Sequence, residues 1–374
     1  MENFLQRKLQ ERVDNDSLRT LQQHPESLAD FHSNDYLSFA QSHILKQKLE
    51  QLLQTYPNYK LGSTGSRLLA GNGKFVEELE QKIAGFHEAE ASLIFNSGYD
   101  ANIGLLSCIA QRGDTIVCDE LIHASLIDGA RLSLANKYTF AHNNLTALED
   151  KLKLSKGNVF IVTESVFSMD GDTAPLLEIN ELAIKYNANL IVDEAHAIGV
   201  IGNNGVGLCQ QLGIQDKIFA RIYTFGKALG CHGAVITGSV LLKTYLINFA
   251  RSFIYTTALP FHALASITVA YSQLYQSAQM VILKENIALF KHLLSRMNLL
   301  LIPSESAIQS IIIEGNSNCK NFANYLQQHG CNVKAILSPT VPAGKERLRI
   351  SLHAHNTKAE IYNLTNLLSA LSKD

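Results

Sequence analysis

Lys227 and Asp193 are the residues of this chain whose types and positions point most directly to chemistry. Lys227 lies in the run TFGKALG, just after an apolar stretch that predicts a strand, and Asp193 ends another such stretch, ANLIV. A lysine held among small residues at a strand end is poorly solvated, which suits covalent chemistry with a carbonyl compound. These two residues predict an enzyme in which pyridoxal 5′-phosphate (PLP) forms a Schiff base with Lys227 while Asp193 keeps the pyridinium protonated.

Five predicted strands end in polar residues that strand propensity would not select. The sets are Asn96, Ser97, Gly98 and Tyr99 after ASLIF; Asp119 and His123 after TIVC; Glu164 and Ser168 after VFIVT; Asp193 and His196 after NLIV; and Thr224 and Lys227 after IYT. Strands that alternate with helical periods predict βαβ units and a mostly parallel sheet. Ligands bind beyond the carboxyl ends of such strands, so we expect all five sets to face one cleft.

The turn at Gly98 and Tyr99 predicts an anion site, because free N–H groups and the dipole at the start of the next helix favour a phosphate. A plain strand-to-helix turn is the alternative. The other residues also have ordinary explanations when they are taken singly. Lys227 could be a surface lysine, Asp193 a helix cap, His123 and His196 satisfied polar residues, and Ser168 and Thr224 turn residues. The functional interpretation therefore depends on the whole set.

The composition is that of an ordinary globular enzyme. The chain has 374 residues, of which 46% are hydrophobic and 18% charged, and its net charge is −2. Without a long basic run, a nucleic-acid or membrane-surface role is disfavoured. The charged N-terminus predicts no signal peptide, and no apolar run approaches the roughly 20 residues of a membrane helix. Six cysteines without a CxxC pair fit a reducing cytoplasm, with neither disulfides nor bound metal.

A change of pattern after Pro260 predicts a second domain. A long helical region extends to about Leu300, followed by the strand candidates IQSIIIEG, VKAILS and RLRISLH and a closing helix from Thr357. We therefore expect an N-terminal segment over residues 1–45, a large PLP-binding domain over 46–275 and a C-terminal α+β domain over 276–374.

Several motifs along nearly the whole chain resemble the α-oxoamine synthase family. They are SNDYLSF, GSRLLAGN, FNSGYDAN, HASLIDGARLS, AHNN, FSMDGDTAPL, VDEAHAIGVIG, TFGKALG and SPTVPAGKERLRISL. Members of this family are fold-type I PLP enzymes that condense an amino acid with an acyl thioester. The resemblance implies an α/β fold with a large, mostly parallel sheet of the seven-stranded type and a smaller C-terminal α+β domain.

The resemblance also implies roles for individual residues. Lys227 matches the Schiff-base lysine, Asp193 the carboxylate at the pyridine nitrogen, His196 the donor to the cofactor's phenolic oxygen, and His123 the histidine stacked on the ring, where it also meets the substrate. Gly98, Tyr99, Ser168 and Thr224 match other cofactor contacts. Thr256 matches a residue that reaches the partner subunit's cofactor, which implies a homodimer. Arg349 matches the arginine that binds the amino-acid carboxylate, and Thr340 and Arg19 match substrate contacts.

The TVPAG segment and the short chain resemble most the branch that condenses L-alanine with a pimeloyl thioester, carried by coenzyme A or by acyl carrier protein. Glycine or another acyl chain, a transamination, and a PLP-binding protein without catalysis remain alternatives. Relatives usually have a histidine where this chain has Val76, and that segment lies near their substrate. Val76 therefore leaves the exact acyl donor open.

Overall fold

The computed structural model describes residues 2–21, 27–275 and 277–371, and their contacts divide the chain into two units. One unit comprises residues 37–167 and 173–280. The other comprises residues 1–36, 168–172 and 281–374, as far as they are described. The division into an N-terminal segment, a large domain and a C-terminal domain, expected from the sequence, remains a prediction.

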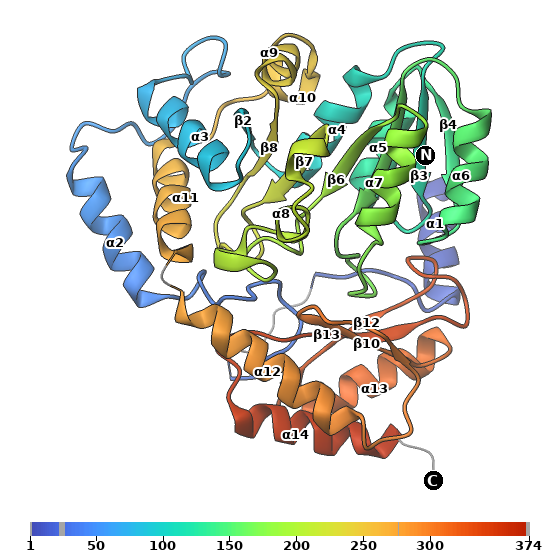
Figure 1. Cartoon of the computed structure of the whole chain (residues 1–374). Coiled ribbons are helices and arrows are strands. Elements are labelled where there is room, and N and C mark those ends of the chain that lie inside the picture. Colours follow the sequence, from blue (N-terminus) through green and yellow to red (C-terminus); the bar gives the residue numbers. More distant parts are fainter. Residues whose placement is uncertain (1, 22–26, 276, 372–374) are drawn as a thin grey trace. The chain divides into compact units, whose positions relative to one another are not determined.

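The first unit is built around a seven-stranded sheet with the order β2-β8-β7-β6-β5-β3-β4 (Figure 1). Its strands are β2 (Ala91–Phe95), β3 (Thr115–Asp119), β4 (Asn136–Phe140), β5 (Val159–Glu164), β6 (Asn189–Asp193), β7 (Ala220–Thr224) and β8 (Ala234–Gly238). Strand β8 is antiparallel to both β2 and β7, and the remaining pairings in this sheet are parallel, so β2, β3, β5, β6 and β7 point the same way. The five strand ends expected to meet at one edge of a mostly parallel sheet do so.

The helices of this unit follow from the helical periods between the strands. They are α2 (His43–Gln54), α3 (Lys74–Phe86), α4 (Gly98–Ile109), α5 (Ala124–Leu132), α6 (Leu145–Leu154), α7 (Leu176–Lys185), α8 (Leu208–Gln211), α9 (Val240–Phe249), α10 (Arg251–Ile254) and α11 (Phe261–Leu274), with short 3₁₀ turns at Asn203–Gly205 and Gln215–Lys217. Helix α4 packs against α5, β7 and β8, while α6 packs against β3 and β4 and α7 against β6.

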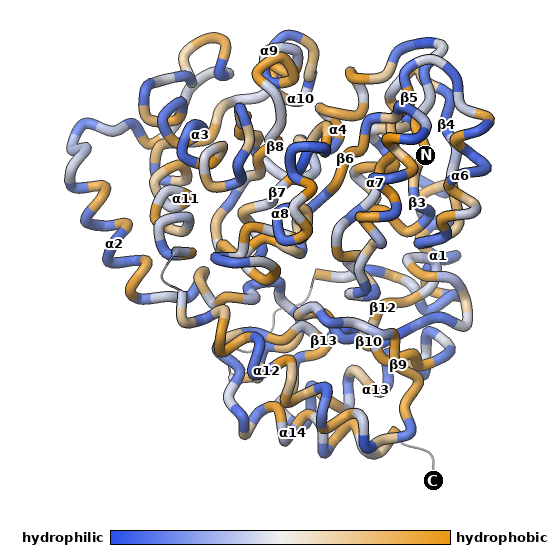
Figure 2. The backbone as a smooth tube through the Cα atoms, viewed as in Figure 1, coloured by the Kyte–Doolittle hydropathy of each residue, from blue (hydrophilic) through white to orange (hydrophobic). Residues whose placement is uncertain are grey.

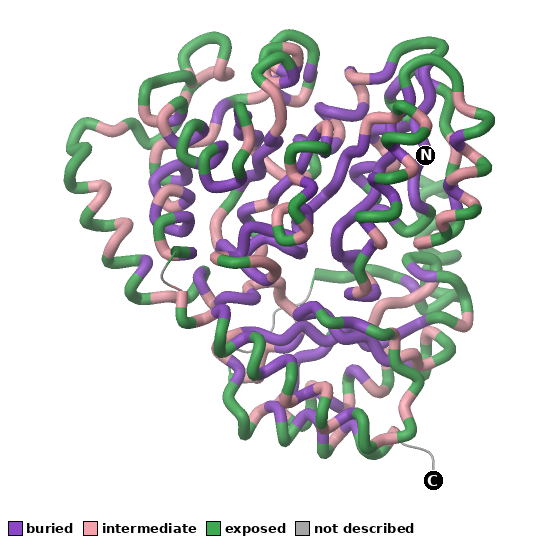
Figure 3. Tube along the Cα trace, in the orientation of Figure 1, coloured by how far each residue is buried: buried purple, intermediate pink, exposed green. Residues whose placement is uncertain are grey.

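The central strands form the core of this unit. Every residue of β2, β3 and β5 is buried, and the tube is coloured as hydrophobic and buried along much of the central strands (Figures 2 and 3). The sequence did not predict β4, because its residues, NKYTF, are mostly polar or exposed, as is usual for an edge strand. Burial on both faces gives the other strands the continuous apolar runs by which they were predicted.

The second unit contains an antiparallel sheet with the order β12-β13-β10-β9 and a short parallel pair, β1 and β11. Its strands are β1 (Ala29–Asp30), β9 (Leu301–Ile302), β10 (Ile308–Ile312), β11 (Cys331–Asn332), β12 (Lys334–Ile336) and β13 (Arg347–Ser351). Its helices are α1 (Asn3–Asp14), α13 (Asn316–Gln328) and α14 (Lys358–Leu368), with a 3₁₀ turn at Ser369–Leu371. Helix α12 (Ala278–Leu294) begins in the first unit and continues into the second, so the long helical region expected after Pro260 consists of α11 and α12.

No helix among the described residues has the length and apolar character needed to cross a bilayer.

A buried ion-pair cluster anchors the glycine-rich segment that precedes α3. The Glu80 carboxylate on α3 lies 2.8 Å from Nη1 of Arg67 and 2.8 Å from Nζ of Lys243, and it accepts the N–H of Ile94 at 3.0 Å. The Glu80 side chain is 1% exposed. Removing one partner of a buried pair leaves the other charge uncompensated, which is far more costly than losing a surface pair.

We expect Glu80→Ala to lower the free energy of unfolding by about 3–5 kcal/mol. Glu78→Ala is the control, because the Glu78 side chain on the same helix is 47% exposed and its Oε1 lies 3.6 Å from Nζ of Lys74. That change should cost about 0.5 kcal/mol or less. Urea unfolding of both variants measures the difference, and equal losses would show that Glu80 is not an anchor.

Candidate active site

Lys227 and His196 meet at the shared edge of β6 and β7. Each lies three residues beyond the end of its strand, and the two strands are parallel neighbours. Nζ of Lys227 lies 2.7 Å from Nε2 of His196, and His196 is buried. The structure therefore brings the predicted Schiff-base lysine and one of the two predicted histidines into hydrogen-bond contact.

Asp193 is the buried carboxylate of this site, and a chain of hydrogen bonds links it to His123. Its Oδ1 accepts the N–H of Ala195 at 2.9 Å, and its Oδ2 accepts from Nδ2 of Asn102 at 2.8 Å. The same amide nitrogen donates to Oγ of Ser125 at 2.9 Å, and that hydroxyl lies 2.7 Å from Nδ1 of His123. Asn102 on α4 thus joins the end of β6 to the start of α5.

The tautomer of His123 follows from its partners. Nδ1 accepts the backbone N–H of Ser125 at 3.2 Å, so it carries a lone pair, and the neutral ring has its hydrogen on Nε2. The backbone N–H of His123 donates to Oε1 of Glu164, which fixes the start of α5 against the end of β5. Beside it, the exposed Tyr99 donates its hydroxyl to Asp128 at 2.6 Å.

Glu164 is a fully buried acid at the same sheet edge. Burial first, and the charge of Asp193 second, raise its pKa to about 8, although Lys227 and the N–H of His123 act in the opposite direction. Glu164 is therefore largely protonated at neutral pH in this unit, which avoids a second negative charge beside Asp193.

Gly98 and Thr224 form a cradle of the kind that a phosphate requires. Gly98 is the first residue of α4, where backbone N–H groups are free to bind an anion. A Cβ at position 98 would lie 2.5 Å from Cγ2 of Thr224, so only glycine allows this close approach. Oγ1 of Thr224 is buried without a hydrogen-bond partner among the described residues. An unsatisfied hydroxyl beside a helix N-terminus fits the phosphate group of PLP.

Thr256 lies in a loop close to the end of β2. Its hydroxyl accepts from Nδ2 of Asn96 at 2.9 Å, and the same amide donates to the carbonyl of Thr257 at 2.7 Å. Asn96 thereby connects Thr256 to the polar residues that follow β2.

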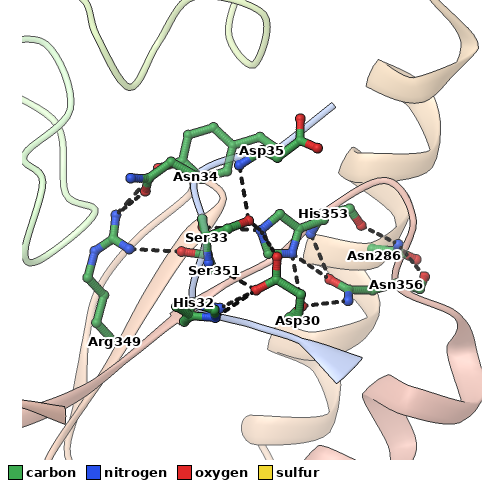
Figure 4. Close-up of polar contacts among 11 residues, drawn as sticks. Asp30, His32, Ser33, Asn34, Asp35, Asn286, Arg349, Ser351, His353 and Asn356 are labelled. Atoms are coloured by element: carbon green, nitrogen blue, oxygen red, sulfur yellow. Dashed lines mark hydrogen bonds and ion pairs between the residues drawn. The ribbon is translucent and has the colours of Figure 1, made fainter. Parts of the chain in front are cut away.

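Ser168 and Arg349 belong to the other unit, where they are bonded to each other. Nε of Arg349 donates to the carbonyl of Ser168 at 2.6 Å, and Nη1 donates to Oγ of Ser351 at 2.9 Å. Nη2 donates to Oδ1 of Asn34 at 3.0 Å and, more weakly, to the hydroxyl of Tyr36 at 3.4 Å. Arg349 is 6% exposed, and these contacts fix its guanidinium plane. Figure 4 shows the contacts with Asn34 and Ser351.

A buried histidine holds the segment that carries Asn34. Nε2 of His353 lies 3.1 Å from both Oγ and the carbonyl oxygen of Ser33, while Nδ1 lies 3.1 Å from the carbonyl oxygen of Asp30 (Figure 4). Asn356 also donates to that carbonyl oxygen at 2.9 Å. The position of Asn34 against Arg349 therefore depends on residues beyond the C-terminal strand.

Arg19 and Thr340, the other two predicted substrate residues, contact each other in this same unit. Nη2 of Arg19 donates to Oγ1 of Thr340 at 3.3 Å, and both side chains are exposed.

Sequence reasoning did not assign functions to Asn102 and Asn34. Both lie inside motifs that were recognised, FNSGYDAN and SNDYLSF, and Asn102 is a polar residue in the largely apolar helix α4. Asn102 follows Gly98 by four residues, so the two share a helix face. That spacing could have predicted a role for Asn102 from the sequence. No such pattern exists for Asn34, because only the fold brings it to Arg349.

Comparison with known proteins defines the class of this protein. A model of the aminotransferase class I and II family matches residues 26–368, so the chain belongs to this family. It is 42% identical over 395 residues to a protein named 8-amino-7-oxononanoate synthase from Emericella nidulans, an alignment that covers 99% of this chain and 95% of that protein.

Solved structures agree with the sequence relatives. Serine palmitoyltransferase from S. paucimobilis, solved with PLP and myriocin bound, superposes with a TM-score of 0.90 at 26% identity and covers 99% of this chain and 96% of its own. The 8-amino-7-oxononanoate synthase of Francisella tularensis gives a TM-score of 0.80 at 31% identity, covering 93% of this chain and 98% of its own. The predicted fold class, that of fold-type I PLP-dependent transferases, is confirmed.

The raised pKa of Glu164 predicts a specific pH dependence of stability. The folded protein keeps this proton up to about pH 8, whereas the ordinary carboxyl pKa is 4.5, so stability falls as pH rises between these values. The glutamine of Glu164→Gln cannot ionise. The urea midpoint of this variant, relative to that of the unsubstituted cofactor-free protein, should therefore increase from pH 5 to pH 8. The exposed Glu178→Gln is the control, and parallel profiles for all three proteins would contradict the assignment.

Proposed function

We propose that this chain is a PLP-dependent acyltransferase that condenses L-alanine with a pimeloyl thioester. The products are 8-amino-7-oxononanoate, carbon dioxide and the free thiol, as in the biotin pathway. The observation that carries this proposal is the cluster of Lys227, His196 and Asp193 in a chain 42% identical, over nearly its full length, to a protein named 8-amino-7-oxononanoate synthase.

PLP is the cofactor, and when bound it supplies an electron-accepting ring that stabilises negative charge on the amino acid's α-carbon. The Asp193 carboxylate is fixed by Asn102 and the N–H of Ala195, so it can hold a proton at the ring nitrogen without moving. The N-terminus of α4 and the unsatisfied hydroxyl of Thr224 would bind the phosphate.

Lys227 has two tasks in the proposed reaction. Its Nζ would hold the cofactor covalently, and as a free neutral amine it would take the proton from the α-carbon of L-alanine. His196, at 2.7 Å from Nζ, is placed to orient the lysine. His123 would stack on the ring with its hydrogen on Nε2.

Arg349 would bind the carboxylate of L-alanine. Its guanidinium has five N–H donors, of which four are used in the contacts with Ser168, Ser351, Asn34 and Tyr36. The contact with Tyr36 is the longest of the four. The remaining N–H of Nη1 and the N–H of Nη2 that faces Tyr36 can therefore form a bidentate pair with a carboxylate. Lysine lacks the planar fork that such a pair requires.

We also propose a cytoplasmic homodimer. Leu68, Leu69 and Tyr255 are 51%, 83% and 73% exposed, and their segments are joined by a bond from the N–H of Ala258 to the carbonyl of Gly65. Exposed apolar side chains in two bonded segments beside Thr256 favour cover by a second copy. The six free cysteines support a reducing compartment.

The direct test is thiol release from pimeloyl thioesters with L-alanine, with mass spectrometry of the product. Parallel reactions with glycine and with acetyl or longer acyl thioesters decide the amino acid and the acyl chain. A product other than 8-amino-7-oxononanoate would reassign the substrate, and an amino-group transfer without thiol release would replace the acyltransferase proposal.

We expect Lys227→Ala to abolish turnover and to remove the Schiff-base absorbance, because the variant lacks the amine that lies 2.7 Å from Nε2 of His196. Lys185→Ala, on the surface of α7, should retain both properties. Normal turnover by the Lys227 variant would contradict the assigned role.

A further inference from the structure

A basic pocket lies in the second unit, among α1, the segment after it, α13 and β12. Its volume is about 460 Å³, within the usual range for small-ligand sites. Among the described residues, four cationic side chains line it, Arg12, Arg19, Lys320 and Lys334, and no acidic one does. Such a concentration of one sign of charge favours an anionic ligand.

The cations of this pocket are largely uncompensated. Arg12, Arg19 and Lys334 form no ion pair with a described residue, and Lys320 lies 3.8 Å from Asp16. Arg12, Arg19 and Lys334 are exposed. Because three like charges line one pocket without an ion-pair partner in the described part of the chain, an anion bound there would meet several cationic donors.

The pocket walls are held by specific hydrogen bonds. Nδ2 of Asn316, at the start of α13, donates to the carbonyl of Asn15 at 2.8 Å, and its Oδ1 accepts the N–H of Ser338 at 2.9 Å. Ser317 donates to Asp16 at 2.5 Å. Helix α13 thus connects the segment after α1 to the loop that carries Thr340, and the contact between Arg19 and Thr340 joins the two walls again.

The register of the antiparallel sheet places this pocket next to the predicted alanine site. Lys334 on β12 is paired with Arg349 on β13. Directly opposed residues of an antiparallel pair point to the same face, with Cβ atoms about 4.5–5.5 Å apart. A ligand that reaches from the pocket toward Arg349 would therefore follow one face of the sheet.

We propose that this pocket binds the phosphate end of a phosphopantetheine thioester, with Arg12 and Lys334 as the phosphate-binding residues. The inference rests on the proposed function, whose acyl donor arrives either on coenzyme A or on a carrier protein. Both carriers join the thioester to a phosphate through the same pantetheine arm. Arg12 and Lys334 can bind that phosphate by charge-assisted hydrogen bonds.

The test compares the double variant Arg12→Gln/Lys334→Gln with the control Lys284→Gln/Lys358→Gln, which removes two exposed positive charges of the same unit outside the pocket. Three acyl donors are used: pimeloyl-coenzyme A, pimeloyl-acyl carrier protein and pimeloyl-N-acetylcysteamine, which has no phosphate. The pocket variant should raise the KM for a phosphate-bearing donor about tenfold. The kcat, the KM for L-alanine and the KM for pimeloyl-N-acetylcysteamine should stay within twofold.

A loss confined to pimeloyl-coenzyme A or to pimeloyl-acyl carrier protein supports the site and identifies the carrier. Equal KM values in the two double variants for both phosphate-bearing donors would overturn it, as would an equal loss with pimeloyl-N-acetylcysteamine.

Calorimetric titration with free coenzyme A and with phosphopantetheine separates this inference from the proposed function. The dissociation constant of at least one of them should weaken about tenfold in the pocket variant and stay unchanged in the control. If the unsubstituted enzyme released no thiol from any donor, the proposed function would fail, while these titrations would still decide the pocket. Equal dissociation constants in the unsubstituted enzyme, the pocket variant and the control variant would reject the proposed phosphate site.

Discussion

The fixed position of the Asp193 carboxylate is the constraint on which the rest of the site depends. Asp193 ends a central strand and is 4% exposed, so protein groups rather than solvent must satisfy its carboxylate oxygens. The N–H of Ala195 and the amide of Asn102 take over that task, and the second hydrogen of Asn102 extends the network to Ser125 and thus to His123. Protonation of Glu164 spares the site a second buried negative charge.

The second unit imposes a comparable constraint on the segment 168–172, which follows Phe167. The carbonyl of Met169 accepts from Ser310, that of Gly171 accepts from Ser304, and Asp170 forms an ion pair with Arg347. Together with the bond from Arg349 to the carbonyl of Ser168, these contacts join the segment to strands β10 and β13. Arg349, which is expected to bind the substrate carboxylate, therefore also helps to fix Ser168, a predicted cofactor contact.

Much of this architecture could be predicted because burial leaves a strong pattern in the sequence. The apolar runs of β2, β3, β5, β6 and β7 mark strands buried on both faces, and the polar residues after them mark the sheet edge where ligands bind. Strand β4 could not be predicted, because an exposed edge strand keeps polar residues.

The partners of the site residues were less predictable than the residues themselves. Lys227 and Asp193 are unusual at strand ends, so they attract attention without a structure. Asn34 is separated from Arg349 by 315 positions, and no local pattern connects them. The basic pocket likewise combines Arg12 with Lys334, which only the pairing of distant segments brings together.

The most direct test of the central claim is the protonation state of the cofactor ring. Enzyme reconstituted with PLP labelled with ¹⁵N at the pyridine nitrogen should give the NMR chemical shift of a protonated ring at neutral pH. Asp193→Asn should give the shift of an unprotonated ring, because an amide does not stabilise the positive charge. An unprotonated ring in the unsubstituted enzyme, or the same protonated shift in both proteins, would contradict the role assigned to Asp193.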